Sequence, residues 1–278
     1  EVDTGSDGHI LDTTPQEVEL KAGGGIRELV FFNDQKPGMR LIKVDSADPS
    51  KVIPNAVFEI KSADGSYGPK EFTTDQNGEI DLSKLPTGAY VVTEKSCEGY
   101  IIDEAQRVIH LGPNENAQFV FTNTAKPSLK IIKTSSDGTP LKGVTFRIAK
   151  IEDGTHYLDR TTSEQGEILI SDLEPGVYSV RETATDSAHV LDTQEYHVAL
   201  FPGKTSTLVI ENQKRPNLIV YKHDADTGEP VPDTVFEVRA ADGHSVDEIK
   251  TDSEGKAELR NLLPGVYEII EKSVPSPY

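Results

Sequence analysis

The chain has 278 residues and a formal net charge of −19 at pH 7, from 28 basic and 47 acidic side chains. Its length allows two or three domains, and its strong negative charge argues against nucleic acid as a partner. No apolar run approaches the length of a membrane span, so we expect no membrane insertion. Cys97 is the only cysteine, which excludes an internal disulfide and a cysteine-based metal cluster.

The sequence repeats itself with a period close to the size of a small domain. Three residue types mark the repeat at intervals of 88 to 90 residues: Lys43, Lys133 and Lys222; Glu94, Glu182 and Glu271; and Asn33, Asn123 and Asn212. We therefore predict the C-terminal part of a repeat over residues 1–36 and whole repeats over 37–126 and 127–215. Residues 216–278 are predicted to be the N-terminal part of a further repeat.

Residues 1–36 contain two short strand-like runs, 17–20 and 28–32, around a glycine-rich turn. On the second run Leu29, Phe31 and Asn33 alternate onto one face, as strand residues do. The end of each whole repeat has the same pattern. We therefore expect the last two strands of a repeat here, followed by a short proline-containing linker.

The first whole repeat opens with a run in which Met39, Leu41 and Lys43 share one face. Further strand-like runs, separated by turn signals, cover residues 56–61, 71–74, 79–82, 89–95, 106–111 and 117–123. The second repeat matches the first element for element, and no stretch has helical periodicity. Short strands with turn signals about every 8–12 residues predict an antiparallel β-sandwich in each repeat.

Each whole repeat directs one lysine, one glutamate and one asparagine toward its apolar interior. In the second repeat Leu129 and Ile131 share a strand face with Lys133, while Glu182 and Asn212 occupy apolar faces of later strands. The equivalent residues are Lys43, Glu94 and Asn123 in the first repeat, and Lys222 and Glu271 in the incomplete last one. An inward lysine is costly unless a partner compensates for it.

Two interpretations account for these buried polar residues. One is a buried ion pair beside a satisfied amide, although desolvation makes such pairs neutral or destabilising. In the other, burial lowers the pKa of the lysine and raises that of the glutamate. The neutral amine then attacks the asparagine carbonyl, which the protonated glutamate polarises, and ammonia is expelled to leave an isopeptide bond. This chemistry needs no cofactor or metal and occurs once per site, so we do not expect a true enzyme.

Several short motifs recur along the chain. They are Lys222-His223-Asp224, Thr251-Asp252-Ser253-Glu254-Gly255, Leu263-Pro264-Gly265-Val266-Tyr267 before Glu271, and Phe119-Val120-Phe121-Thr122-Asn123. Together they resemble the collagen-adhesin B-type (Cna B-type) domains of Gram-positive surface proteins and pilins. The resemblance implies an all-β fold of tandem prealbumin-like (Ig-like) sandwiches. It also implies Lys43–Asn123 and Lys133–Asn212 bonds with Glu94 and Glu182 as catalytic residues, although Ser135 replaces the usual acid two positions after the lysine.

The same resemblance implies a stalk or shaft segment of an extracellular adhesin or pilin, anchored to the cell wall through a region outside this chain. Its isopeptide bonds would resist force and proteolysis, and its partners would be neighbouring repeats. The alternative is a ligand-binding adhesin module that contacts host matrix or glycan. The chain contains no tryptophan, a residue that binding hot spots favour, and the sequence identifies no host ligand.

The two ends of the chain are predicted to be complementary half-domains. One hypothesis is that Lys222 and Glu271 of one molecule meet Asn33 of the next, which would give head-to-tail self-association and an intermolecular crosslink. The alternative is that the two halves stay unpaired or meet only as crystal contacts. Pairing of Asn33 with Lys43 is disfavoured, because the nine residues between them are too few for a crossover between parallel strands. Cys97 is predicted to lie in a loop, where a lone thiol usually has no specific role; an intermolecular link through it is the alternative.

Overall fold

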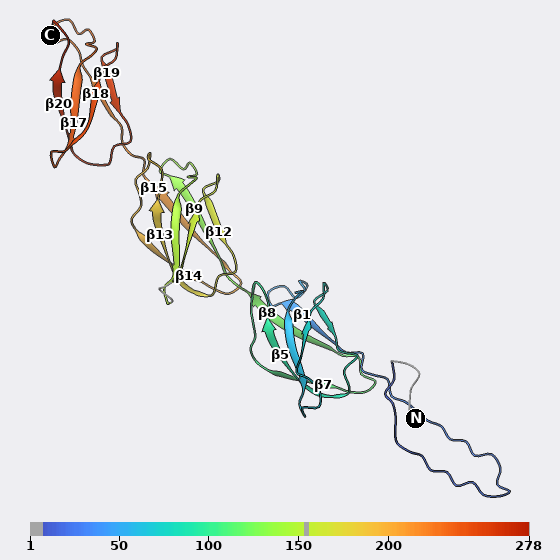
Figure 1. Cartoon of the computed structure of the whole chain (residues 1–278). Helices are drawn as coiled ribbons and strands as arrows, with labels where there is room; N and C mark the ends of the chain where they lie inside the picture. The colour runs from blue at the N-terminus through green and yellow to red at the C-terminus, as the bar shows by residue number, and fades with distance from the viewer. Residues whose placement is uncertain (1–7, 153–155, 278) are drawn as a thin grey trace. The chain divides into compact units, whose positions relative to one another are not determined.

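The computed structural model describes residues 8–152 and 156–277. Twenty β-strands form the sheets of these residues, which agrees with the all-β prediction (Figure 1). The described residues contain no helix that could cross a membrane. Residues 1–7 and Tyr278, which belong to the two predicted half-domains, lie outside the described residues.

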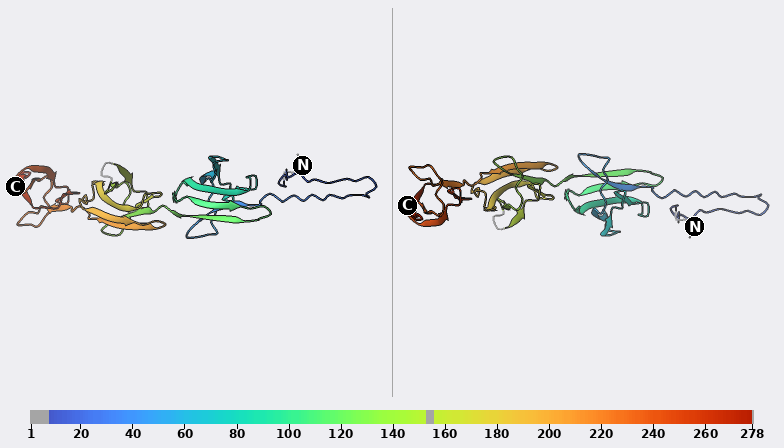
Figure 2. Two further views of the ribbon diagram at one scale, coloured as in Figure 1. Left: turned by 90° about the horizontal axis from the view of Figure 1, so that it is seen from below. Right: turned by 90° about the horizontal axis from the view of Figure 1, so that it is seen from above.

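The first whole repeat is a sandwich of two four-stranded sheets, whose layers can be followed in Figure 2. One sheet has the order β4-β1-β8-β6 and the other β3-β2-β5-β7. The strands are β1 (Arg40–Asp45), β2 (Val57–Ser62), β3 (Lys70–Thr73), β4 (Glu79–Asp81), β5 (Gly88–Ser96), β6 (Tyr100–Ile101), β7 (Arg107–Leu111) and β8 (Gln118–Ala125). The first and last strands, β1 and β8, pair in parallel, with Lys43 opposite Phe121.

Strand alternation builds the core of this repeat. Leu41 on β1, Phe58 and Ile60 on β2, and Tyr90 and Val92 on β5 are all 2% exposed or less. Successive side chains of a strand point to opposite faces, so these residues meet between the two sheets. Burying one such large side chain contributes about 1.5–3 kcal/mol, which makes this layer the main source of stability.

The second whole repeat is also a sandwich, of one three-stranded and one four-stranded sheet, and its described residues include no strand that corresponds to β6. Its sheets have the orders β12-β9-β15 and β11-β10-β13-β14. The strands are β9 (Ser128–Ser135), β10 (Thr145–Lys150), β11 (Tyr157–Thr161), β12 (Glu167–Ile170), β13 (Gly176–Ala184), β14 (Glu195–Leu200) and β15 (Thr205–Asn212). First and last strands again run parallel, with Lys133 opposite Ile210 and Ser135 opposite Asn212.

The last repeat contains two smaller sheets, β16-β19 and β18-β17-β20. The strands are β16 (Leu218–Tyr221), β17 (Val235–Ala240), β18 (Ser245–Lys250), β19 (Lys256–Leu259) and β20 (Tyr267–Ser273). Phe236, Val238, Ile249 and Ala257 form its buried cluster. Strand β16 corresponds to β1 and β9, and among the described residues it pairs with β19 alone. The other edge of β16 corresponds to the edge at which β1 pairs with β8 and β9 pairs with β15, and among the described residues this edge of β16 is unpaired.

The described part of the N-terminal segment differs from the sequence prediction. Residues 8–36 form no strand, although two were expected over 17–20 and 28–32. An isolated bridge joins His9 to Gln35, and Figure 1 shows the chain between them running out and back without strand arrows. Phe32 is 83% exposed. Two strands alone bury too little apolar surface to be stable in water, which explains the difference.

Candidate functional site

The sandwich brings the lysine, glutamate and asparagine of the first whole repeat together. Lys43 comes from β1 and Asn123 from its parallel neighbour β8, while Glu94 reaches them from β5 of the opposite sheet. The three residues are 1%, 3% and 5% exposed, respectively. The site therefore lies inside the sandwich, where water does not weaken its electrostatic interactions.

In this first site Glu94 contacts both other members. Its Oε1 atom lies 3.2 Å from Lys43 Nζ and accepts a hydrogen bond of 2.7 Å from Asn123 Nδ2. The backbone N–H of Asp103 donates to Oε2 at 3.1 Å, which fixes the carboxylate. The ring of Phe58 lies beside the lysine, with its centroid 5.7 Å from Nζ. One carboxylate thus bridges the amine and the amide nitrogen.

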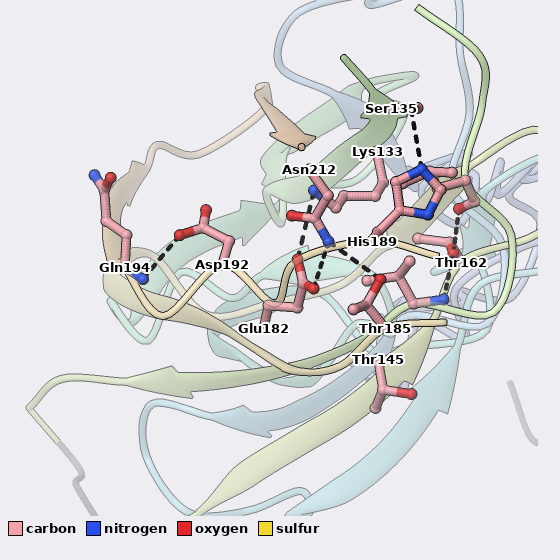
Figure 3. Close-up of polar contacts among 12 residues, drawn as sticks. Lys133, Ser135, Thr145, Thr162, Glu182, Thr185, His189, Asp192, Gln194 and Asn212 are labelled. Atoms are coloured by element: carbon pink, nitrogen blue, oxygen red, sulfur yellow. Dashed lines mark hydrogen bonds and ion pairs between the residues drawn. The ribbon is translucent and has the colours of Figure 1, made fainter. Parts of the chain in front are cut away.

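The second whole repeat reproduces this geometry (Figure 3). Lys133 on β9 places Nζ 3.4 Å from Glu182 Oε2 on β13. Asn212 on β15 donates from Nδ2 to Glu182 Oε1 at 2.7 Å. The same nitrogen donates to Thr185 Oγ1 at 3.1 Å. Lys133, Glu182 and Asn212 are all 3% exposed or less, so both predicted sets of three residues are assembled and buried.

The orientation of the amide differs from the sequence expectation. We expected a protonated glutamate to polarise the asparagine carbonyl, but in both sites the NH₂ group faces the carboxylate. An ionised carboxylate can only accept hydrogen bonds, so it binds the amide nitrogen. The Oδ1 atoms of Asn123 and Asn212 are buried without a hydrogen-bond partner among the described residues. The glutamate therefore touches the nitrogen of each reacting partner rather than the carbonyl oxygen.

Burial shifts the proton equilibria of these groups. It lowers the pKa of Lys43 and of Lys133, and the neighbouring carboxylates only partly oppose this shift. It also raises the pKa of Glu182, against the hydrogen bond from Asn212 and the charge of Lys133. Both shifts favour neutral groups over charged ones. The neutral pair, a free amine beside a carboxylic acid, is thus more populated in this site than it would be in water.

Backbone contacts hold the lysine strands in place. In both sites the carbonyl of a turn glycine accepts the lysine N–H at 2.8 Å: Gly78 for Lys43 and Gly166 for Lys133. Both glycines have a φ of +70°, a conformation that favours glycine. A Cβ atom on either glycine would collide with the carbonyl oxygen of the lysine. This turn therefore requires glycine and sets the depth of the lysine in the sandwich.

The comparison with protein families decides the identity of the fold. Residues 38–125, 127–214 and 216–278 each match the family model described as SpaA, prealbumin-like fold domain. The chain belongs to this family. The match confirms both the predicted fold class and the resemblance to Gram-positive surface-protein and pilin domains.

Solved structures similar to the chain include the Bacillus anthracis TIE protein, with 24% identity over 85% of this chain and 45% of that one, and a TM-score of 0.37. A streptococcal ancillary pilin has 18% identity over 86% of this chain and 91% of that one, with a TM-score of 0.38. The shaft pilin spaA from Lactobacillus rhamnosus GG has 14% identity over 64% and 97%, with a TM-score of 0.41. The chain thus spans less than half of the TIE protein. A comparison with curated proteins finds no match.

In both whole SpaA-type domains, a segment after the glutamate strand is tied to the lysine strand, and the sequence analysis did not assign it this role. In the first domain Tyr100 donates from its hydroxyl to Asp45 Oδ2 at 3.1 Å. In the second, His189 Nε2 lies 3.0 Å from Ser135 Oγ. Tyr100 and His189 are one repeat apart, as are Asp45 and Ser135. Where the second domain has Ser135 in place of the acid Asp45, it therefore also has His189 in place of Tyr100 as the partner.

Cys97 lies in the loop after β5, as predicted, but its side chain is buried there. It is 6% exposed and belongs to the core cluster of the first SpaA-type domain. Burial raises the pKa of its thiol to about 11, with a further contribution from the charge of Glu94. A buried, neutral thiol is a poor nucleophile, so the structure does not support an intermolecular link through Cys97.

The incomplete last SpaA-type domain holds two members of the set. Lys222 Nζ donates to Glu271 Oε2 at 2.8 Å, and the two side chains are 29% and 40% exposed. Asn33 lies in the segment before the first whole domain and belongs to neither buried site. Lys222 and Glu271 thus meet without an asparagine, and they remain more exposed than their counterparts.

Proposed function

We propose that this chain is a structural stalk or shaft segment of an extracellular Gram-positive surface protein or pilin. Each whole SpaA-type domain in it forms its own Lys–Asn isopeptide bond. One observation carries the proposal. In both domains a buried glutamate lies within 3.4 Å of the lysine amine and 2.7 Å from the asparagine amide nitrogen.

The geometry supports a proton shuttle through the glutamate. Glu182 first takes a proton from Lys133, and the neutral Nζ attacks Cγ of Asn212. A C–N bond forms, Glu182 passes that proton to Nδ2, and the Cγ–Nδ2 bond breaks to release ammonia. The regenerated carboxylate then takes the second proton of Nζ, which leaves a neutral amide. The same steps apply to Lys43, Glu94 and Asn123. Holding the reactants in place can supply about 7–11 kcal/mol of the barrier reduction.

The alternative of a permanent buried ion pair explains fewer of the observations. A structural polar cluster satisfies its buried hydrogen-bonding atoms. Here the Oδ1 atoms of Asn123 and Asn212 have no hydrogen-bond partner among the described residues, and neither does Lys133 Nζ, whose one contact is the ion pair with Glu182. Desolvation of an ion pair costs several kcal/mol per ion. Crosslinking removes the charge of the amine and leaves Nζ with one N–H donor in place of three.

The position of the bond suits a mechanical role. The lysine lies on the first strand of each sandwich and the asparagine on the last, and these strands are parallel neighbours. A covalent bond between them carries tension across the domain without separating strands. Unfolding and proteolysis both require an opened state, which the bond suppresses. We also propose that the protein is anchored to the cell wall.

Intact-mass spectrometry of the purified chain tests the proposal. We expect the loss of two ammonia molecules, one for each buried site. Tryptic digestion should yield two branched peptides, one joining Lys43 to Asn123 and one joining Lys133 to Asn212. An unmodified mass would contradict the proposal, and a branched peptide joining Asn33 to Lys43 would contradict the assignment of strands to domains.

The unpaired edge of β16 could bind a strand from a second molecule, and this is the second part of the proposal. Lys222 and Glu271 already meet at 2.8 Å, and residues 28–33 of a second copy have the apolar alternation of a last strand, with Leu29 and Phe31 45% and 52% exposed. We propose that this segment pairs with β16 and places Asn33 at Lys222. A dimer band that survives boiling and disappears in Asn33→Ala would support this link. A single monomer band at every concentration would exclude it.

A further inference from the structure

Thr185 contacts the reacting amide of the second SpaA-type domain. It directly follows β13, three residues after Glu182, and its Oγ1 accepts a hydrogen bond of 3.1 Å from Asn212 Nδ2. The other hydrogen of that nitrogen is donated to Glu182 Oε1 at 2.7 Å. Figure 3 shows Asn212 between these two acceptors. Both N–H groups of the amide are therefore fixed.

We propose that Thr185 is a positioning residue for crosslinking, which holds the leaving nitrogen of Asn212 against Glu182. This inference rests on the proposed function. The terminal torsion of an asparagine is broad and has no sharp preference of its own. Two acceptors on one planar NH₂ group fix the plane of the amide, and thus the face of Cγ that Lys133 can attack. With Glu182 as the one acceptor, the plane could rotate about that hydrogen bond.

Thr185 also suits the step in which ammonia leaves. Glu182 delivers the proton that it took from Lys133 to Nδ2, which then carries three hydrogens as the Cγ–Nδ2 bond breaks. Thr185 Oγ1 accepts one of the two hydrogens already present, which keeps Nδ2 beside Glu182 while the nitrogen, pyramidal after the attack, turns its lone pair toward the protonated carboxyl. The threonine gains and loses no atom in the reaction. Its contribution is orientation, on which the rate of such reactions depends strongly.

The segment that carries Thr185 is held by contacts of its own. His189 is 6% exposed and connects Asp186, 2.7 Å from Nδ1, to Ser135, 3.0 Å from Nε2. The backbone N–H of Val190 donates to the carbonyl of Gln213 at 2.9 Å. These contacts tie the segment both to the lysine strand and to the chain just after Asn212. Thr185 is therefore supported on both sides, as a preorganised site requires.

The repeats provide a natural comparison at this position. The residue three places after the glutamate is Thr185 in the second domain, Cys97 in the first and Val274 in the last. The Cys97 thiol interacts with both Asn123 and Glu94, but sulfur is a weaker hydrogen-bond acceptor than oxygen. We therefore expect the first domain to crosslink more slowly than the second when both start from the unfolded state.

A refolding experiment measures both rates in one molecule. Uncrosslinked chains are purified from inclusion bodies in urea, checked for intact mass, and diluted into neutral buffer. Samples are quenched in acid over time, and tryptic peptides report the Lys43–Asn123 and Lys133–Asn212 bonds separately. Circular dichroism of the same samples follows folding. The bond in the unmodified domain acts as an internal clock for the mutated one.

In Thr185→Val we expect the Lys133–Asn212 bond to form about three- to tenfold more slowly, the range that loss of one neutral hydrogen bond gives. The Lys43–Asn123 rate should not change, and Thr185→Ser should restore most of the lost rate. Cys97→Thr should accelerate the first domain. The thermal midpoint of Thr185→Val in a Lys133→Met background, which cannot crosslink, gives the purely structural cost.

Two results would overturn the inference and have different meanings for the proposed function. If wild type loses both ammonia molecules while Thr185→Val crosslinks at the wild-type rate, the role of Thr185 is refuted and the crosslink stands. If wild type folds and loses no ammonia, both fail. Should Thr185→Val not fold, Cys97→Thr decides, since an unchanged rate in the first domain would refute the role of this position.

Discussion

Glu182 and Asn212 belong to opposite sheets of one sandwich, yet Glu182 Oε1 lies 2.7 Å from Asn212 Nδ2. Lys133 lies on the same sheet as Asn212, with Nζ 3.4 Å from the other oxygen of the carboxylate. The glutamate therefore spans the apolar core to reach two residues of the facing sheet. This position connects the folding of the sandwich to chemistry, because the site exists only after both sheets have packed.

Glu182→Gln should abolish the Lys133–Asn212 bond and leave the Lys43–Asn123 bond intact. The amide preserves the size of the side chain but cannot shuttle a proton between Nζ and Nδ2. The crosslinked residues are 79 positions apart, so the loss should destabilise the second domain by about 4 kcal/mol on loop-closure grounds. Branched-peptide mapping and thermal unfolding measure the two effects. Glu94→Gln is the matched control, in which the pattern should reverse.

The rate of crosslinking in the second domain should fall in acid. The reactive pair shares one proton between Lys133 and Glu182. Burial raises the pKa of Glu182 above its ordinary value of 4.5, so on acidification the pair binds a second proton, on Glu182, at a higher pH than an exposed glutamate would be protonated. Glu182 then cannot accept the lysine proton, and attack stops. Refolding at stepped pH, with circular dichroism to confirm folding, should show the decline beginning above pH 4.5. A rate that stays constant down to that pH would contradict the shuttle.

Cys97 should resist alkylation in the native chain. Burial raises the pKa of its thiol to about 11, so at pH 8 a small fraction is thiolate and the reagent has little access. We expect iodoacetamide to label native protein at least tenfold more slowly than urea-unfolded protein, by mass spectrometry. Rapid native labelling would show that the segment around Cys97 opens readily. The Cys97→Ser variant controls for labelling at other residues.

Gly166→Ala should disturb the second domain far more than Gly138→Ala. Both glycines have positive φ values, +70° and +81°, so alanine costs about 1–2 kcal/mol of backbone strain at either position. At Gly166 the added Cβ also meets the carbonyl oxygen of Lys133, whereas at Gly138 it meets no atom within 4 Å. Thermal unfolding measures the difference, and branched-peptide yield shows whether Lys133 is displaced. Equal effects of the two substitutions would exclude this role of the turn.

The sequence predicted the buried sets of residues because strand alternation and the repeat period are both local properties. Lys133, for example, shares its face with Leu129 and Ile131, and all three are fully buried. It could not predict the orientation of the Asn212 amide, which depends on the protonation of a residue in the opposite sheet. The burial of Cys97 was also missed, because a position just after a strand does not reveal what covers it.

The N-terminal segment shows a different limit. Its runs over 17–20 and 28–32 have strand-like alternation, but residues 8–36 form no strand. Alternation predicts which side chains a sheet would bury, but a strand forms only where neighbouring strands are present to pair with it. The partner of Ser135 was hidden for a related reason. Only the fold shows that His189 lies over a strand 54 residues away.

Crosslinks between the parallel first and last strands would also limit how far the chain can lengthen under load. With both bonds formed, residues 44–122 and 134–211 lie inside closed loops and cannot be drawn out. Between Asn123 and Lys133 the load-bearing path contains nine residues, which extend to about 30 Å. A series of these domains would therefore lengthen very little under tension, and the lengthening would come from the linkers between domains.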